Sequence, residues 1–286
     1  MQFDTQKMAQ SIQAFKKLPD DVKLNIQKSS VRLTNGTFTG SGVFVIDSSG
    51  TPGIITAKHN LSVKAGIPTP KEWNKQETKD LIAGFLKNLK ISYNDNAAPF
   101  DPTMKVQPNK TVEIGPANSS IEFRLNENWD YDLIFIKPPQ PLMAYISGHP
   151  SRRILYDYKN AYKGELKDQP VYITGYGDVL DASGKQISLT HYFQVRADVV
   201  TKDRGDVMRE KTPNFYFKEA LLISASPKTS TAPGDSGGPV FFVTARNVVY
   251  LVGITLGANY DTDKLLPDNP ICNNASTSIM HESGLF

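Results

Sequence analysis

The chain has 286 residues, of which 39% are apolar and 21% are charged, enough to bury the core of one large domain or two modest ones. Its 32 basic and 29 acidic side chains leave a net charge of +3, which is too small to indicate a nucleic-acid partner. No apolar run approaches the ~20 residues that span a bilayer, so we expect no membrane partner.

The N-terminus and the cysteine content both indicate a reducing compartment. The first 19 residues are polar, with Met8, Ile12 and Phe15 on one helical face, which predicts a short helix ending before Pro19 rather than a secretory leader. The single cysteine, Cys272, allows no intrachain disulfide. We therefore expect a cytoplasmic protein, or a secreted one only if a leader has been removed.

Short apolar runs separated by turn residues follow this helix and predict an all-β fold. A first series of strands is expected at residues 31–33, 43–46, 53–56, 89–93, 111–114 and 133–136. The dipeptide Asn35-Gly36 predicts a hairpin turn between the first two. A second series is expected at residues 171–174, 187–200, 215–224, 240–244 and 248–255.

Two segments interrupt the β pattern. Residues 71–88 combine good helix formers with apolar side chains four apart, which predicts a helical insertion on the outside of the first β unit. The proline-rich residues 137–141 predict an extended linker. The predicted domains are therefore an N-terminal helical extension (1–28), a first β unit (29–137) and a second β unit with linker and C-terminal tail (138–286).

The run GDSGGP at residues 234–239 contains a candidate nucleophile. Acyl transfer needs an activated hydroxyl, a base to take its proton and donors for the developing oxyanion. Glycines around Ser236 let the backbone turn sharply, so that the amides of Gly234 and Ser236 can converge on one oxygen. The alternative is an ordinary glycine-rich turn before a strand, which a shorter Gly/Ser/Pro cluster would favour.

This run resembles the nucleophile motif of the chymotrypsin family of serine proteases. Further segments match that family's motifs in the same order: GSGVFV (40–45), GIITAKH (53–59), YDLIFIK (131–137), TGYG (174–177) and GITLG (253–257). The resemblance covers roughly residues 30–260 and is to a disulfide-free member of bacterial or viral type. It implies an all-β fold of two six-stranded Greek-key barrels packed together, with an N-terminal helix and a helical insertion in the first barrel.

The resemblance also implies a serine endopeptidase that acts through an acyl-enzyme on Ser236. His59 would be the general base, Asp132 would orient it, and the amides of Gly234 and Ser236 would form the oxyanion hole. The expected partner is a protein or peptide substrate, and no cofactor or metal ion is implied.

Other residues and other functions remain as alternatives. Asp130 could take the place of Asp132, although only Asp132 is followed directly by the apolar run. Cys272 has no nucleophile motif around it and is expected to be a spectator thiol. Three more histidines are expected to be structural or solvated: His149, His191 and His281. The alternative functions are a catalytically silent binding module on the same fold and a viral or regulatory self-processing protease.

The resemblance extends to substrate recognition. It implies a primary specificity pocket with Ser230 at its base and Thr231 beside it, and serine there favours an uncharged, apolar residue before the scissile bond. The segment formed by Thr255, Leu256 and Gly257 would pair with the substrate backbone as an added strand.

Control of activity is expected to involve Asp235. In many relatives the equivalent aspartate pairs with an amine released when a pro-segment is cleaved. Either Asp235 has another partner in this chain, or the helix up to Lys17 is a pro-segment that is cut at residues 16–18.

Overall fold

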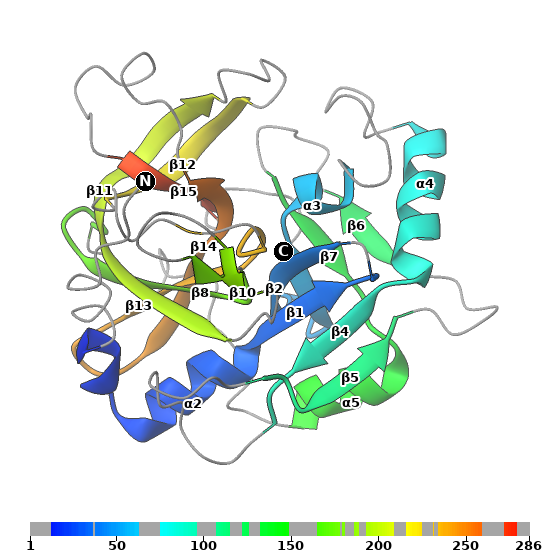
Figure 1. The fold of residues 1–286 in the computed structure, drawn as a ribbon, viewed down its shortest axis with the longest axis horizontal. Coiled ribbons are helices and arrows are strands. Elements are labelled where there is room, and N and C mark those ends of the chain that lie inside the picture. The colour runs from blue at the N-terminus through cyan, green and yellow to red at the C-terminus, as the bar shows by residue number, and fades with distance from the viewer. Residues whose placement is uncertain are drawn as a thin grey trace.

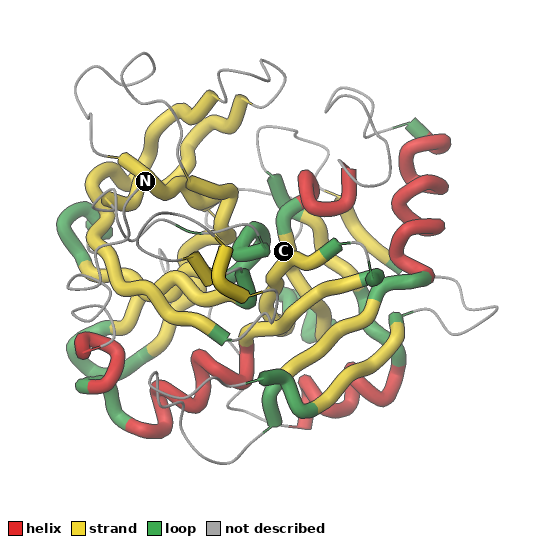
Figure 2. Tube along the Cα trace, in the orientation of Figure 1, coloured by secondary structure: helices red, strands yellow, loops and turns green. Residues whose placement is uncertain are grey.

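The computed structural model describes residues 13–36, 38–62, 75–95, 107–114, 122–125, 132–148, 165–177, 179–180, 186–188, 193–208, 216–224, 231, 234–258 and 272–278. Two antiparallel β units lie side by side (Figure 1), and strands make up most of both (Figure 2). The expected all-β class is confirmed. The boundaries of the three predicted domains remain predictions, although the strands of the two units fall on either side of residue 137.

The first β unit is a seven-stranded antiparallel sheet in the order β5-β4-β1-β2-β3-β7-β6. Its strands are β1 (Ser30–Thr34), β2 (Thr39–Ile46), β3 (Pro52–Thr56), β4 (Lys90–Tyr93), β5 (Lys110–Glu113), β6 (Phe123–Leu125) and β7 (Ile134–Ile136). β1 and β2 form the expected hairpin, in which Gly36 adopts the left-handed φ of 93° that glycine favours. The three-residue β6 was not expected and raises the strand count from six to seven.

The second β unit is a closed six-stranded barrel in the order β11-β12-β15-β14-β13-β8. Its strands are β8 (Pro170–Gly175), β11 (Gln194–Met208), β12 (Tyr216–Ser224), β13 (Pro239–Val243), β14 (Val249–Ala258) and β15 (Cys272–Ser278), and a two-stranded ribbon is formed by β9 (Val179–Leu180) and β10 (Gln186–Ser188). β15 pairs with both β12 and β14. It was not expected, because the sequence CNNASTS has no apolar alternation.

Three of the described helices accompany the first β unit. α3 (Lys58–Ser62) follows β3, and α4 (Gln76–Lys87) is the expected helical insertion. α5 (Gln140–Gly148) begins where an extended linker was expected, so that prediction is wrong from residue 140 onward. Proline is tolerated in the first turn of a helix, and the buried side chains of Leu142 and Ile146 pack into the core of the first unit.

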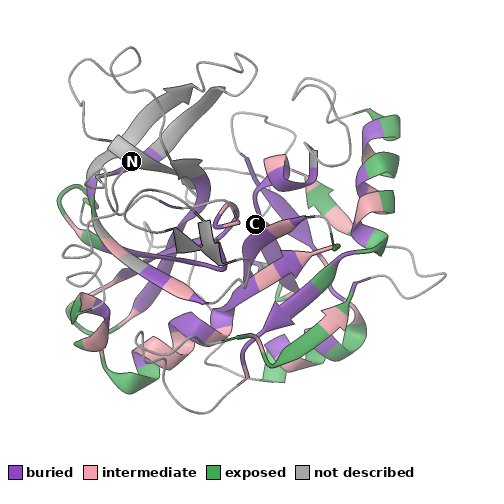
Figure 3. Cartoon of the chain, viewed as in Figure 1, coloured by how far each residue is buried: buried purple, intermediate pink, exposed green. Residues whose placement is uncertain are grey.

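The N-terminal segment belongs to the core. Residues 13–16 are helical and the chain turns at Pro19, as expected, but a second helix, α2 (Asp20–Ser29), follows. Phe15 and Ile26 are fully buried in a cluster that contains side chains from both β units, such as Val43 on β2 and Phe241 on β13. Figure 3 shows buried residues on α2 and on strands of both β units. The segment therefore joins the two units.

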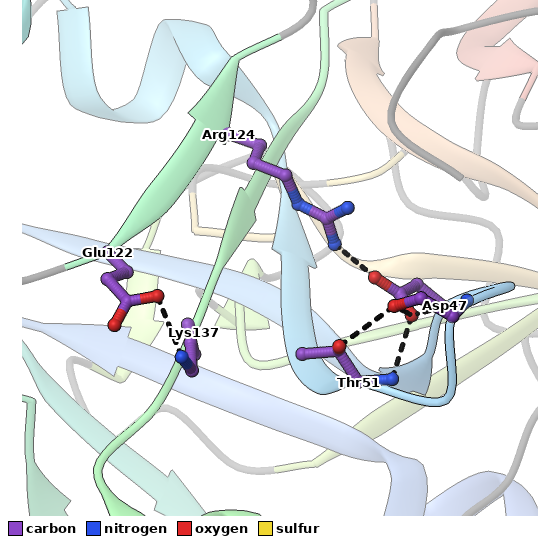
Figure 4. A network of polar contacts seen from close by, with 6 residues as sticks. Asp47, Thr51, Glu122, Arg124 and Lys137 are labelled. Atoms are coloured by element: carbon purple, nitrogen blue, oxygen red, sulfur yellow. Dashed lines mark hydrogen bonds and ion pairs between the residues drawn. The ribbon is translucent and has the colours of Figure 1, made fainter.

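A polar network fixes the turn between β2 and β3 (Figure 4). Asp47 Oδ1 accepts hydrogen bonds from Ser49 N at 2.9 Å and Thr51 N at 2.8 Å, and its other oxygen pairs with Arg124 on β6. The Arg124 guanidinium also lies 4.1 Å from the centre of the Phe135 ring. A pocket of about 420 Å³ adjoins the network and is lined by Thr51, Glu122, Phe123, Arg124, Phe135 and Lys137.

Candidate active site

Strand register brings His59 and Asp132 together. β3 pairs with β7 so that Thr56 lies opposite Ile134. Two residues beyond this pair, Lys58 N donates to the backbone oxygen of Asp132 at 3.3 Å. The carboxylate then meets the next residue: His59 N donates to Asp132 Oδ1 at 2.8 Å, and His59 Nδ1 contacts Asp132 Oδ2.

The carboxylate of Asp132 is held in its ionised form. Asp132 is only 1% exposed, and burial alone would raise its pKa. The charge of His59, the hydrogen bonds from its ring and backbone, and the charge of Lys58 outweigh burial and hold the pKa of Asp132 below its ordinary value. The His59 side chain keeps 16% of its surface exposed, so a buried anion orients a partly exposed imidazole.

Ser236 lies in a tight loop before β13. Gly234 and Gly237, on either side, have left-handed φ angles of 95° and 84°. The loop is tied to β14, since Gly237 N donates to Thr255 O at 2.9 Å and Thr255 N donates to Gly238 O at 2.8 Å. Within the described part of the chain, the N–H groups of Gly234 and Ser236 donate no hydrogen bond. Two backbone donors therefore remain beside a partly exposed hydroxyl.

The first β unit contacts this loop directly. Ser236 O accepts hydrogen bonds from Ser41 N at 2.9 Å and from Asn60 Nδ2 at 2.7 Å. Gly234 O accepts one from Ser41 Oγ at 2.8 Å. Asn60 follows His59 on α3, so the histidine and the serine segments are joined through one side chain. Sequence reasoning missed Ser41 and Asn60, and the only signal for either was the position of Ser41 inside a matched motif.

Asp235 is buried under the turn that follows β8. It is 1% exposed, and Gly177 N donates to Asp235 Oδ1 at 2.8 Å. A Cβ atom at Gly175 or at Gly177 would lie only 2.5 Å from atoms of this carboxyl group. The glycines of the TGYG motif therefore make room for Asp235, and the Gly177 amide is one partner of its carboxylate.

The other predicted residues fall into two groups. Thr231, Thr255 and Leu256 are buried, and both backbone groups of Thr255 bond to the Ser236 loop. Gly257 pairs with Ala275 on β15. Their roles in substrate binding remain predictions. The remaining predicted or alternative residues lie outside the described part: Ser230, Asp130, His149, His191 and His281.

Among the described residues, no group of three or more His, Cys, Asp or Glu side chains could hold a metal ion. No described helix is both long enough and apolar enough to cross a membrane.

Comparison with known proteins gives only distant structural likeness. No family model matches the sequence, and no curated protein is significantly similar to it. Among solved structures, the chain is similar to the Rv3671c protease of M. tuberculosis in its inactive form, with 13% identity, a TM-score of 0.46 and coverage of 91% of this chain and 87% of that one. It is also similar to the MamO protease domain of Magnetospirillum magneticum, with 14% identity, a TM-score of 0.45 and coverage of 89% and 93%. A Glu endopeptidase gives 13% identity, a TM-score of 0.48 and coverage of 89% and 86%.

Proposed function

We propose that this protein is a serine endopeptidase. One observation carries the proposal: a buried, ionised Asp132 accepts hydrogen bonds from both the backbone and the ring of His59. Such a carboxylate fixes the tautomer of the imidazole and stabilises the imidazolium that forms when the ring takes a proton. Asn60, the next residue of the same helix, donates to the carbonyl of Ser236, which supports a shared site for His59 and the serine.

The proposed reaction uses the chain's own groups. His59 Nε2 removes the proton of Ser236 Oγ as that oxygen attacks the carbonyl carbon of the scissile peptide bond. The amides of Gly234 and Ser236 stabilise the oxyanion of the tetrahedral intermediate. His59 then gives the proton to the leaving amine, which leaves an acyl-enzyme on Ser236, and water activated by His59 hydrolyses the acyl-enzyme.

The proposed substrate is a protein or peptide that lies alongside β14 beyond Thr255. Both backbone groups of Thr255 bond to the serine loop, so pairing with a substrate strand would begin at Leu256 and Gly257. The resemblance implies Ser230 at the pocket base, and on that ground an uncharged residue is proposed before the scissile bond. A peptide-library profile dominated by Lys, Arg or Glu at that position would contradict this preference.

Covalent labelling tests the proposed chemistry without knowledge of the substrate. A fluorophosphonate probe should label the wild-type chain on Ser236, and labelling should be lost in Ser236→Ala and in His59→Ala. Ser49→Ala, which removes a serine from the turn between β2 and β3, is the matched control and should be labelled like the wild type. An unlabelled but folded wild-type chain would support a catalytically silent binding module instead.

A further inference from the structure

The first β unit holds the backbone on both sides of the proposed oxyanion donor at Ser236. Ser41 Oγ donates to Gly234 O at 2.8 Å, while Ser41 N and Asn60 Nδ2 donate to Ser236 O at 2.9 and 2.7 Å. Between them, Asp235 O accepts a hydrogen bond from Gly238 N at 2.8 Å. Three successive carbonyl groups are therefore fixed. Because each peptide unit is planar, the Ser236 N–H, which shares a plane with Asp235 O, is fixed as well.

Asn60 connects this backbone to the helix that carries His59. It is 7% exposed and immediately follows His59 on α3. Besides Ser236 O, its amide reaches Thr56 Oγ1 at 3.3 Å, and Thr56 Oγ1 donates to Ser41 O at 2.7 Å. Ser41, Thr56 and Asn60, which we call the carbonyl clamp, thus form a closed ring of hydrogen bonds around Ser236 O. Buried hydrogen bonds of this kind restrict motion because breaking one leaves polar groups without water.

Gly237 gives independent evidence that the clamp approaches the loop closely. A Cβ atom at this position would lie 2.1 Å from Thr56 Oγ1, 2.3 Å from Ser41 O and 2.7 Å from Asn60 Nδ2. All three of those atoms belong to the clamp. The glycine after the serine is therefore required by the contact between the two β units as well as by its φ of 84°.

We propose that Asn60 and Ser41 are positioning residues that keep the Ser236 amide aligned with His59. The inference rests on the proposed function. It explains how the His59 segment of the first β unit and the Ser236 loop of the second are held in a fixed position relative to each other. Oxyanion stabilisation depends on donors that are fixed before the reaction. Loss of the clamp should therefore weaken binding of the tetrahedral state and leave binding of the ground state almost unchanged.

The test compares Asn60→Leu, which keeps the volume but removes the amide, with Asn60→Ala and Ser41→Ala. Asn88→Ala, at an exposed asparagine that ends α4, is the matched control. Hydrolysis of 4-nitrophenyl acetate gives kcat and KM, and phenylboronic acid, which forms a tetrahedral adduct on a reactive serine, reports oxyanion stabilisation. Circular dichroism and thermal melting check folding.

For Asn60→Leu we expect kcat to fall about 10- to 100-fold with KM within about threefold of wild type. Affinity for phenylboronic acid should fall by a similar factor, while Ser41→Ala gives a smaller loss because the Ser41 N–H remains. If Asn60→Leu does not fold, Asn60→Ala is judged by the same criteria, and Ser41→Ala decides the outcome if neither folds.

A folded variant with wild-type kcat and boronate affinity, or with a raised KM and unchanged kcat, would overturn the inference. A wild-type chain that is no more active than Ser236→Ala would instead overturn the proposed function, and this inference with it.

Discussion

The Phe15 ring packs edge-on against the ring of Tyr172 on β8, with 5.9 Å between the ring centres. Phe15 comes from the helical turn before Pro19, and its side chain is fully buried. The contact joins the N-terminal segment to the barrel. Removal of a pro-segment should leave the core of both β units intact, whereas removal of Phe15 would take away part of that core.

Phe15→Ala should destabilise the protein by about 3–5 kcal/mol, because it leaves a cavity where both β units meet. Urea unfolding measures the change. Leu81→Ala, at a leucine of α4 that is 50% exposed, is the control and should change stability little, and Phe15→Leu should cost less than Phe15→Ala. A chain that starts at Leu18 should also be less stable than the full chain. If that shortened chain is as stable and more readily labelled at Ser236, the pro-segment hypothesis stands and our interpretation of Phe15 is wrong.

Asp132→Asn should lower kcat/KM for ester hydrolysis by about 10⁴, because an amide cannot hold the imidazole in the required tautomer or stabilise imidazolium. Thermal stability should change far less than activity, since the side-chain shape is kept. Asp21→Asn, at an exposed aspartate of α2, is the control and should be fully active. A loss smaller than tenfold in Asp132→Asn would mean that Asp132 is not the orienting group. It would favour the alternative, Asp130.

Stability should fall at acid pH in a way that depends on Asp47. Burial alone would raise the pKa of Asp47, but hydrogen bonds from Ser49 and Thr51 and the charge of Arg124 hold it below its ordinary value. A carboxylate with a lowered folded-state pKa stabilises the fold fully above its unfolded pKa, about 3.9, and this stabilisation is lost as pH falls through the folded value. Urea unfolding from pH 6 to pH 2.5 should show the loss.

The variant Asp47→Asn isolates this contribution. It should be less stable than the wild type by about 1–2 kcal/mol at pH 6 and should lose less stability on acidification. Asp21→Asn again serves as the control, with a pH profile parallel to that of the wild type. Parallel profiles for Asp47→Asn and wild type would show that the turn network has no part in acid sensitivity.

Two glycines with similar backbone angles should respond differently to alanine. Gly36 and Gly237 have φ angles of 93° and 84°, but a Cβ atom at Gly36 meets nothing within 4 Å, whereas one at Gly237 meets the carbonyl clamp. Gly36→Ala should cost about 1–2 kcal/mol of backbone strain and keep activity. Gly237→Ala should cost more and abolish labelling of Ser236. Equal losses in the two variants would mean that contact with the clamp adds nothing to the strain.

Sequence reasoning predicted strands well where apolar residues form short runs between turns, as in β2, β3 and β13. It failed where the signal was short or polar. β6 has three residues, and β15 is a polar strand that forms because β12 and β14 offer open edges on both sides. α5 was missed because prolines favour extended chain in general, although Pro141 falls in the tolerated first turn of the helix.

The candidate site divides in the same way. The resemblance to the chymotrypsin-family motifs implied that His59 and Asp132 would meet, and the pairing of β3 with β7 brings them together in the structure. The role of Asn60 could not be predicted from motifs, because its partner, Ser236 O, is a backbone atom that lies 176 residues away in the sequence. Asparagine beside a histidine carries no local pattern, and only the packing of the two β units gives it a role.

The place of β15 in the barrel constrains the order in which the site can assemble during synthesis. β15 is inserted between β12 and β14, so the barrel cannot close until residues 272–278 have left the ribosome. The strands of the first unit are complete at Ile136, and His59 and Asp132 both precede that residue. The proposed base can thus form earlier in translation than the closed barrel that carries the proposed nucleophile, Ser236.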